Sequence, residues 1–118
     1  MPNIYGAPET EVQEVADKRK RGDAFVLLDV REQMELRLAN LGNDVLWIPL
    51  SDLAARREAA LTEEFDDRDA TIVVFCHTGV RSAQVTAWLR QLGWQNTFSM
   101  AGGIEAYALQ IDSSVGRY

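Results

Sequence analysis

The chain has 118 residues, of which 47% are hydrophobic and 25% are charged, as is typical of one folded domain. We expect residues 1–118 to form a single domain, and no apolar run approaches the roughly 20 residues that a membrane-spanning helix needs. The formal net charge of −6 argues against nucleic acid as the main partner, because binding to phosphate backbones needs clustered cations.

The sequence has one cysteine, Cys76, and one histidine, His77. An internal disulfide is therefore excluded, and no cluster of cysteines and histidines is available to bind a metal ion. We expect neither a metal nor another cofactor. The free cysteine, and an N-terminus without a basic segment followed by an apolar one, predict a protein of the reducing cytoplasm.

The chain begins with a pattern typical of a helix. A proline and acidic residues at 7–11 resemble a helix start, and the basic run 18–21 places cations near the negative end of the helix dipole. Gly22 can then supply the C-terminal cap.

Four short apolar runs predict buried strands, and helical patterns alternate with them. The expected strands are residues 25–28, 45–48, 70–75 and 97–100. The expected later helices are residues 32–38, 51–61 with Ser51 as N-cap, 80–92 and 102–110. This alternation predicts one α/β domain with a mostly parallel sheet, and residues 112–118 show no clear periodicity.

Cys76 directly follows the expected strand 70–75 and precedes a short loop and a helix. A strand that leads through a loop into a helix N-terminus directs backbone N–H groups, and the positive end of the helix dipole, at one point. That environment favours the thiolate over the thiol. The pattern therefore predicts that Cys76 is a sulfur nucleophile.

The segment C-H-T-G-V-R-S at residues 76–82 resembles the active-site loop C-x-x-G-x-R-S of rhodanese-type sulfurtransferases. Three further segments resemble motifs of that family in the same order. They are L-D-V-R-E at 28–32, I-P-L-S-D-L at 48–53, and A-G-G-I with a tyrosine in place of the family tryptophan at 101–107.

The resemblance implies a rhodanese-like α/β fold, with a five-stranded, mostly parallel sheet flanked by helices on both faces. It also implies a two-step reaction in which Cys76 takes the outer sulfur of a small donor such as thiosulfate and becomes a persulfide. The sulfur then passes to an acceptor such as cyanide, a dithiol, or a thioredoxin-like or sulfur-carrier protein. Because the chain has no second cysteine, the acceptor must be external. A monomer is expected.

The resemblance assigns residues 76–82 to the active-site loop, in which Cys76 is catalytic. The other loop residues are His77, Thr78, Gly79, Val80, Arg81 and Ser82. Backbone amides from 78 to 82 are expected to donate to the transferred sulfur, while His77 lines the loop and can tune donor choice. Asp29 and Arg31 are expected to support the loop. For Arg81, pairing with Asp29 is the favoured interpretation, and contact with an anionic donor is the alternative.

Two further segments bear on the comparison with the family, one as a departure and one as a resemblance. Residues 38–44 replace the G-H-I-P-G-A segment that usually precedes the third strand, so the sequence does not predict the conformation of this connection. Residues 115–118 resemble the tail of rhodanese domains fused to enzymes that activate ubiquitin-like proteins, which points to a sulfur-carrier acceptor.

Three alternatives remain at the level of sequence. Cysteine phosphatases of the same fold use C-x5-R, whereas Cys76 and Arg81 form C-x4-R, a shorter loop better suited to one sulfur atom than to a phosphate. A rhodanese-like module that only binds a partner often lacks the cysteine that is present here. A persulfide carrier or sensor would form the persulfide but turn over poorly.

Overall fold

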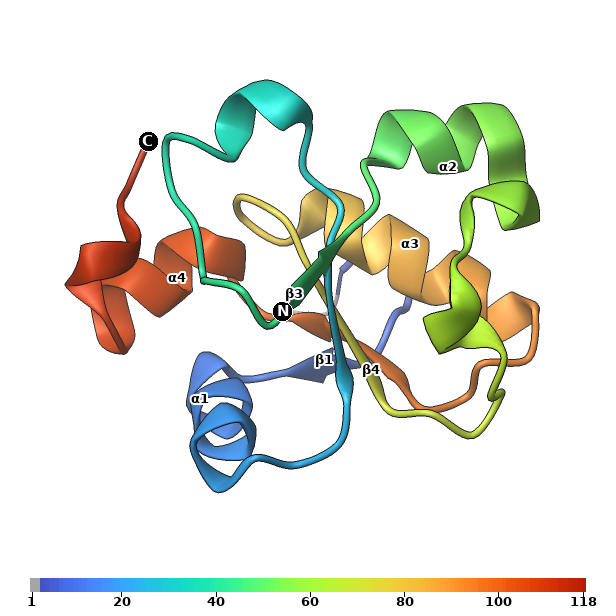
Figure 1. Cartoon of the computed structure of the whole chain (residues 1–118), viewed down its shortest axis with the longest axis horizontal. Helices are drawn as coiled ribbons and strands as arrows, with labels where there is room; N and C mark the ends of the chain where they lie inside the picture. Colours follow the sequence, from blue (N-terminus) through green and yellow to red (C-terminus); the bar gives the residue numbers. More distant parts are fainter. Residues whose placement is uncertain (1–2) are drawn as a thin grey trace.

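A five-stranded parallel sheet runs through the computed structural model, which describes residues 3–118 (Figure 1). Residues 1 and 2 belong to the expected domain and N-terminus but lie outside the described residues. The sheet order is β1-β5-β4-β2-β3, and every neighbouring pair is parallel. The strands are β1 (Glu9–Thr10), β2 (Val26–Asp29), β3 (Val45–Trp47), β4 (Ile72–Phe75) and β5 (Thr97–Met100). The predicted fold class is confirmed.

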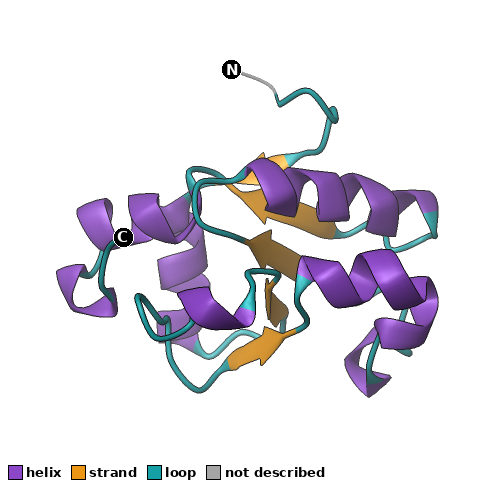
Figure 2. Ribbon diagram, turned by 90° about the horizontal axis from the view of Figure 1, so that it is seen from above, coloured by secondary structure: helices purple, strands orange, loops and turns teal. Residues whose placement is uncertain are grey.

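The α-helices of residues 3–118 flank the sheet on both faces (Figure 2). They are α1 (Val12–Arg21), α2 (Leu50–Arg56), α3 (Val80–Gln91) and α4 (Gly103–Gln110). Short 3₁₀ turns are η1 (Gln33–Glu35), η2 (Arg57–Ala60), η3 (Glu63–Phe65) and η4 (Ser113–Val115). Within residues 3–118, none of these helices has the length and apolar character needed to cross a membrane.

Alternating side chains of the central strands pack into two separate hydrophobic cores, one on each face of the sheet. On one face, Leu27 and Val73 pack with residues of α1 and α4. On the other face, Leu28 and Val74 pack with residues of α2 and α3. Because β4 is covered on both faces, all four of its residues are buried. This burial fixes the strand that leads directly into Cys76.

The predicted start of the first helix is wrong. Glu9 and Thr10 form the edge strand β1, opposite Ser99 and Met100 of β5, and α1 begins only at Val12. Proline has no backbone N–H, but it is tolerated beside an edge strand, where its carbonyl alone can take part in the pairing. Here the Ser99 amide donates to the Pro8 oxygen. The other end of α1 agrees with the sequence, since Gly22 is a left-handed C-cap with φ 72°.

Ser51 does not cap the second helix as predicted. Helix α2 begins at Leu50, with Pro49 in the N-cap position and no side-chain cap. The Ser51 amide and hydroxyl instead donate to the Glu32 carboxylate at 3.1 and 2.6 Å. Helix α2 ends at Arg56, and Arg57, at φ 52°, leads into η2 rather than continuing an α-helix to residue 61.

The connection at residues 38–44 packs against α1 and the C-terminal tail. Its Ala39 and Leu41 side chains are buried in the core that α1 and α4 cover. Its Asn40 amide donates to the Val115 carbonyl. Arg19 of α1 donates to the Leu41 carbonyl at 2.7 Å. The connection therefore ties the tail of the chain to the sheet.

Candidate active site

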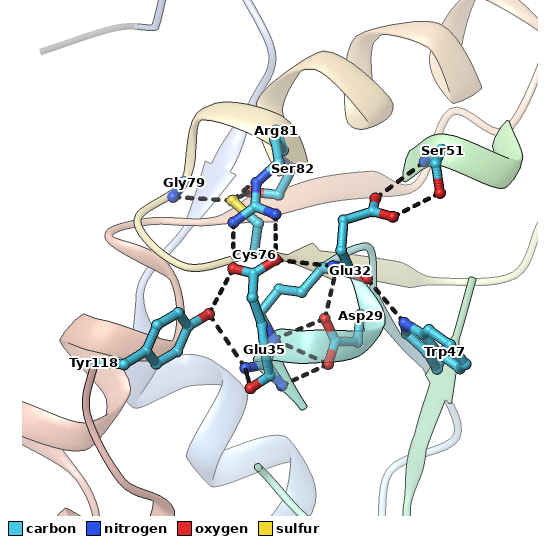
Figure 3. Close-up of polar contacts among 11 residues, drawn as sticks. Asp29, Glu32, Glu35, Trp47, Ser51, Cys76, Gly79, Arg81, Ser82 and Tyr118 are labelled. Carbon is cyan, nitrogen blue, oxygen red and sulfur yellow. Dashed lines mark hydrogen bonds and ion pairs between the residues drawn. The ribbon is translucent and has the colours of Figure 1, made fainter. Parts of the chain in front are cut away.

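Cys76 lies directly after β4, at the carboxyl end of the parallel sheet, and only 1% of the residue is exposed. Ligands of open α/β sheets bind at this end. The amide of Gly79 donates to the Cys76 Sγ at 3.1 Å, and the amide of Ser82 donates to it at 3.4 Å (Figure 3). Two backbone donors from the expected range therefore converge on the sulfur.

A chain of hydroxyl groups continues from the sulfur into the core. The Ser82 Oγ lies 3.4 Å from the Cys76 Sγ and 2.8 Å from the Ser99 Oγ, and both serines are fully buried. Either hydroxyl can be the donor in the serine pair. If Ser99 donates to Ser82, the Ser82 hydroxyl is free to donate to a Cys76 thiolate. A charged sulfur can thus gain a third hydrogen bond.

Glycine backbone conformations shape the loop from both sides. Gly79 has φ 109° and occupies the N-cap position of α3. Gly103, at φ 64°, opens α4 so close to the loop that an added Cβ would lie 2.4 Å from the His77 oxygen. From there the Ile104 amide donates to the Cys76 carbonyl at 2.9 Å. The start of α4 therefore holds the loop backbone in place.

Arg81 forms a two-pronged ion pair with Glu35, not with Asp29. Its Nη1 and Nη2 lie 2.6 and 2.8 Å from Oε2 and Oε1 of that carboxylate (Figure 3). The hydrogen bonds from Arg81 lower the pKa of Glu35 to about 2. The pKa of Arg81 is raised, mainly by Glu35 and to a smaller degree by the nearby Cys76. The predicted Arg81–Asp29 pair is therefore wrong.

Asp29 pairs with Arg31 instead, and this pair is almost completely buried. Three Arg31 donors reach the carboxylate: the backbone amide, Nε and Nη2, at 2.8 to 3.1 Å. The Arg31 side chain has no exposed surface, and its guanidinium lies 5.8 Å from the centre of the Phe75 ring. The two residues bind each other, and Arg31 also donates to the Glu35 carbonyl and the Tyr118 hydroxyl, so their support of the loop stays a prediction.

Tyr118 packs against the active-site loop. Its ring stacks on His77, with a centroid distance of 3.9 Å and an angle of 11° between the rings. Its hydroxyl donates to the Glu35 Oε1 at 2.8 Å and accepts from the Arg31 Nη1 at 3.3 Å. The His77 Nε2 is buried with no hydrogen-bond partner among the described residues. His77 is therefore half-buried, with its ring covered by Tyr118 of the tail.

The remaining loop residues lie at its surface. Thr78 is exposed, and 61% of Val80 is exposed. Sequence reasoning missed three residues that contact the loop, namely Glu35, Ser99 and Tyr118. A serine in the expected buried strand 97–100 was a usable signal for Ser99, because a buried hydroxyl needs a partner.

Residues 11–110 match the family model of the rhodanese-like domain. The chain belongs to the rhodanese-like family. The motif resemblance is thereby confirmed at family level over most of the chain.

Relatives in the family differ in overall architecture. The chain is 32% identical over 96 residues to the chloroplastic rhodanese-like/PpiC domain-containing protein 12 of Arabidopsis thaliana, covering 81% of this chain and 31% of that protein. It is 30% identical over 106 residues to the probable adenylyltransferase/sulfurtransferase MoeZ of Mycobacterium tuberculosis, covering 90% of this chain and 26% of that protein. The chain thus spans less than a third of the length of these two curated relatives.

A solved structure of similar size has the same fold. The human single-domain sulfurtransferase TSTD1 superposes with a TM-score of 0.72 at 26% identity, covering 89% of this chain and 98% of that chain. The rhodanese-like fold therefore extends over nearly the whole described chain.

Proposed function

We propose that this protein is a sulfurtransferase that carries a sulfane sulfur on Cys76. The observation that supports it most is the convergence of the Gly79 and Ser82 amides on the Cys76 Sγ at the carboxyl end of β4. N–H groups directed at a sulfur stabilise its negative charge both as thiolate and as persulfide. No base is required to create the nucleophile in such a site.

The proposed reaction has two displacement steps. The Cys76 thiolate attacks the outer sulfur of thiosulfate, a new S–S bond forms, and sulfite leaves with the electron pair of the broken bond. A nucleophilic acceptor then attacks the outer sulfur of the persulfide, and the Cys76 thiolate leaves. The charge stays on sulfur near the loop amides throughout.

The acceptor in this proposal is external, because Cys76 is the only cysteine of the chain. A dithiol, a thioredoxin-like protein or a sulfur-carrier protein fits the chemistry. The similarity to MoeZ, whose name combines an adenylyltransferase with a sulfurtransferase, supports a sulfur-carrier acceptor. A single free thiol that must remain reduced between turnovers is consistent with a reducing compartment such as the cytoplasm.

Phosphate-ester hydrolysis is the competing activity in this fold. A phosphate dianion needs cationic hydrogen-bond donors that are free to bind its oxygens. An arginine usually binds phosphate in a bidentate manner, through two nitrogens of its guanidinium. In this protein both terminal nitrogens of Arg81 are occupied by Glu35. The pairing favours a site for one sulfur atom over a site for phosphate.

Steady-state assays of the purified protein test this proposal. We expect turnover of thiosulfate with cyanide as acceptor, measured as thiocyanate, and no turnover by the Cys76→Ser variant. An aryl phosphate serves as the parallel substrate. Thiocyanate formation that persists in Cys76→Ser, or hydrolysis of the phosphate ester that depends on Cys76, would contradict the proposal.

A further inference from the structure

Three arginines near the active-site loop are each paired with a carboxylate. Arg81 is paired with Glu35, and the buried Arg31 is paired with Asp29. Arg117 forms two hydrogen bonds to the Glu105 carboxylate, at 2.9 and 3.1 Å. The chain as a whole has a net charge of −6. An anionic donor that approaches Cys76 therefore meets three arginines whose charges are already neutralised by carboxylates.

Two further hydrogen bonds, besides those from Arg81, hold the Glu35 carboxylate in place. The Tyr118 hydroxyl donates to its Oε1, and the Glu32 amide donates to its Oε2 at 2.8 Å. Only 14% of its side chain is exposed, against 30% for Arg81. With a pKa of about 2 this carboxylate is charged at any pH near neutrality. The pair therefore remains formed under the conditions in which sulfur transfer would occur.

The charge of the donor matters because the nucleophile is itself an anion. Each additional negative charge on the donor increases its repulsion from the Cys76 thiolate, and a free arginine close by would offset that repulsion. Arg81 is near enough to Cys76 for the two groups to interact electrostatically. Glu35 cancels this charge at close range. A dianionic donor loses more electrostatic attraction through this cancellation than a monoanionic donor does.

We propose that Glu35 is a positioning residue that sets the donor class, so that the site prefers monoanionic sulfane donors, such as organic thiosulfonates, over the thiosulfate dianion. This inference rests on the proposed function of Cys76. In the corresponding step, the thiolate attacks the outer sulfur of R–SO₂–S⁻ and forms the persulfide anion. The S–S bond of the donor breaks, and the sulfinate R–SO₂⁻ leaves with its electron pair.

Methanethiosulfonate and thiosulfate form a matched pair of donors for the test. They differ by a methyl group in place of one anionic oxygen. The second-order rate constant for loading Cys76 with sulfur is measured for each donor by rapid quenching and mass spectrometry. The quantity of interest is the ratio of the two rate constants, because differences in intrinsic reactivity cancel when the ratios of two variants are compared.

The decisive variant is Glu35→Gln, which frees the charge of Arg81 and retains an acceptor oxygen. We expect its ratio to shift by about tenfold toward thiosulfate relative to wild type. The control is Glu32→Gln, which removes a carboxylate of the same segment that binds Ser51 instead of Arg81. The control should retain the wild-type ratio. A shift in Glu35→Gln of less than about threefold, or an equal shift in the control, would overturn the inference.

The wild type supplies a second measurement that needs no variant. Salt screens repulsion between the thiolate and the donor, so the rate with thiosulfate should rise with ionic strength and rise more than the rate with methanethiosulfonate. A thiosulfate rate that stays constant or falls would mean that no net repulsion acts on the donor at the site, and would overturn the inference. If neither donor loads sulfur onto wild-type Cys76, the proposed function fails first.

Discussion

Two arginine–carboxylate pairs lie near Cys76, and they differ in exposure. The Arg31–Asp29 pair has exposed side-chain fractions of 0% and 3%, whereas the Arg81–Glu35 pair has 30% and 14%. The first pair is buried, and its Arg31 guanidinium lies near the Phe75 and Tyr118 rings. The second lies beside the sulfur. The same chemistry therefore has two expected consequences: the buried pair governs stability, and the exposed pair governs the charge that a donor meets.

The largest expected effect comes from breaking the buried pair. Arg31→Met leaves the Asp29 carboxylate buried without its cation, so we expect the free energy of unfolding to fall by about 3 to 5 kcal/mol. The matched variant Arg81→Met acts on the partly exposed pair and should cost about 1 kcal/mol or less. Urea denaturation measures both. Equal losses of unfolding free energy in the two variants would contradict the expectation that the buried pair contributes more to stability than the partly exposed pair.

A smaller but still large effect is expected where α4 supports the loop. In Gly103→Ala the new Cβ would lie 2.4 Å from the His77 oxygen and 2.6 Å from the Cys76 oxygen. We expect the free energy of unfolding to fall by about 3 kcal/mol, because the left-handed backbone disfavours a side chain and the added Cβ clashes with the loop. Gly22→Ala is the control, because φ is 72° there and nothing lies within 4 Å of the added Cβ. It should lose only about 1 kcal/mol in the same denaturation experiment.

The weakest expected effect is the dependence of the exposed pair on pH. Arg81 holds the pKa of Glu35 at about 2 in the folded protein, below the usual value of 4.5 for this side chain. A lowered folded-state pKa stabilises the fold above the unfolded-state value, and this stabilisation disappears as the pH falls toward 2. Partial exposure reduces the effect to about 1 kcal/mol.

Stability curves of wild type and Glu35→Gln against pH measure this contribution. The advantage of the wild type should be full above about pH 5 and shrink steadily below it. An advantage that is constant from neutral to acidic pH would mean that Glu35 stabilises the fold through contacts other than its charge.

The parts of the fold that sequence predicted depend on local patterns. The strand β4, Cys76 and the cap Gly79 occupy one continuous segment, where hydrophobicity and residue type determine the conformation. The strand β1 was missed for the opposite reason. Its two residues pair with β5, some 90 positions away, and acidic residues after a proline resemble a helix start when that partner is not considered.

The partner of Arg81 shows the same limit within the candidate site. Asp29 and Glu35 are both acidic and both precede the third strand, so the sequence offers no local reason to prefer one of them. The choice depends on η1, which turns the chain so that Glu35 faces Arg81 from 46 positions away. The Tyr118 contacts with His77 and Glu35 depend equally on tertiary packing.

Intact-mass spectrometry of the purified protein tests the central proposal most directly. After incubation with a sulfane donor and removal of the excess, wild type should gain the mass of one sulfur atom. The gain should disappear when a thiol acceptor is added and should be absent in Cys76→Ser. A wild type that gains no sulfur from either thiosulfate or methanethiosulfonate, or a Cys76→Ser variant that still gains it, would contradict a persulfide on Cys76.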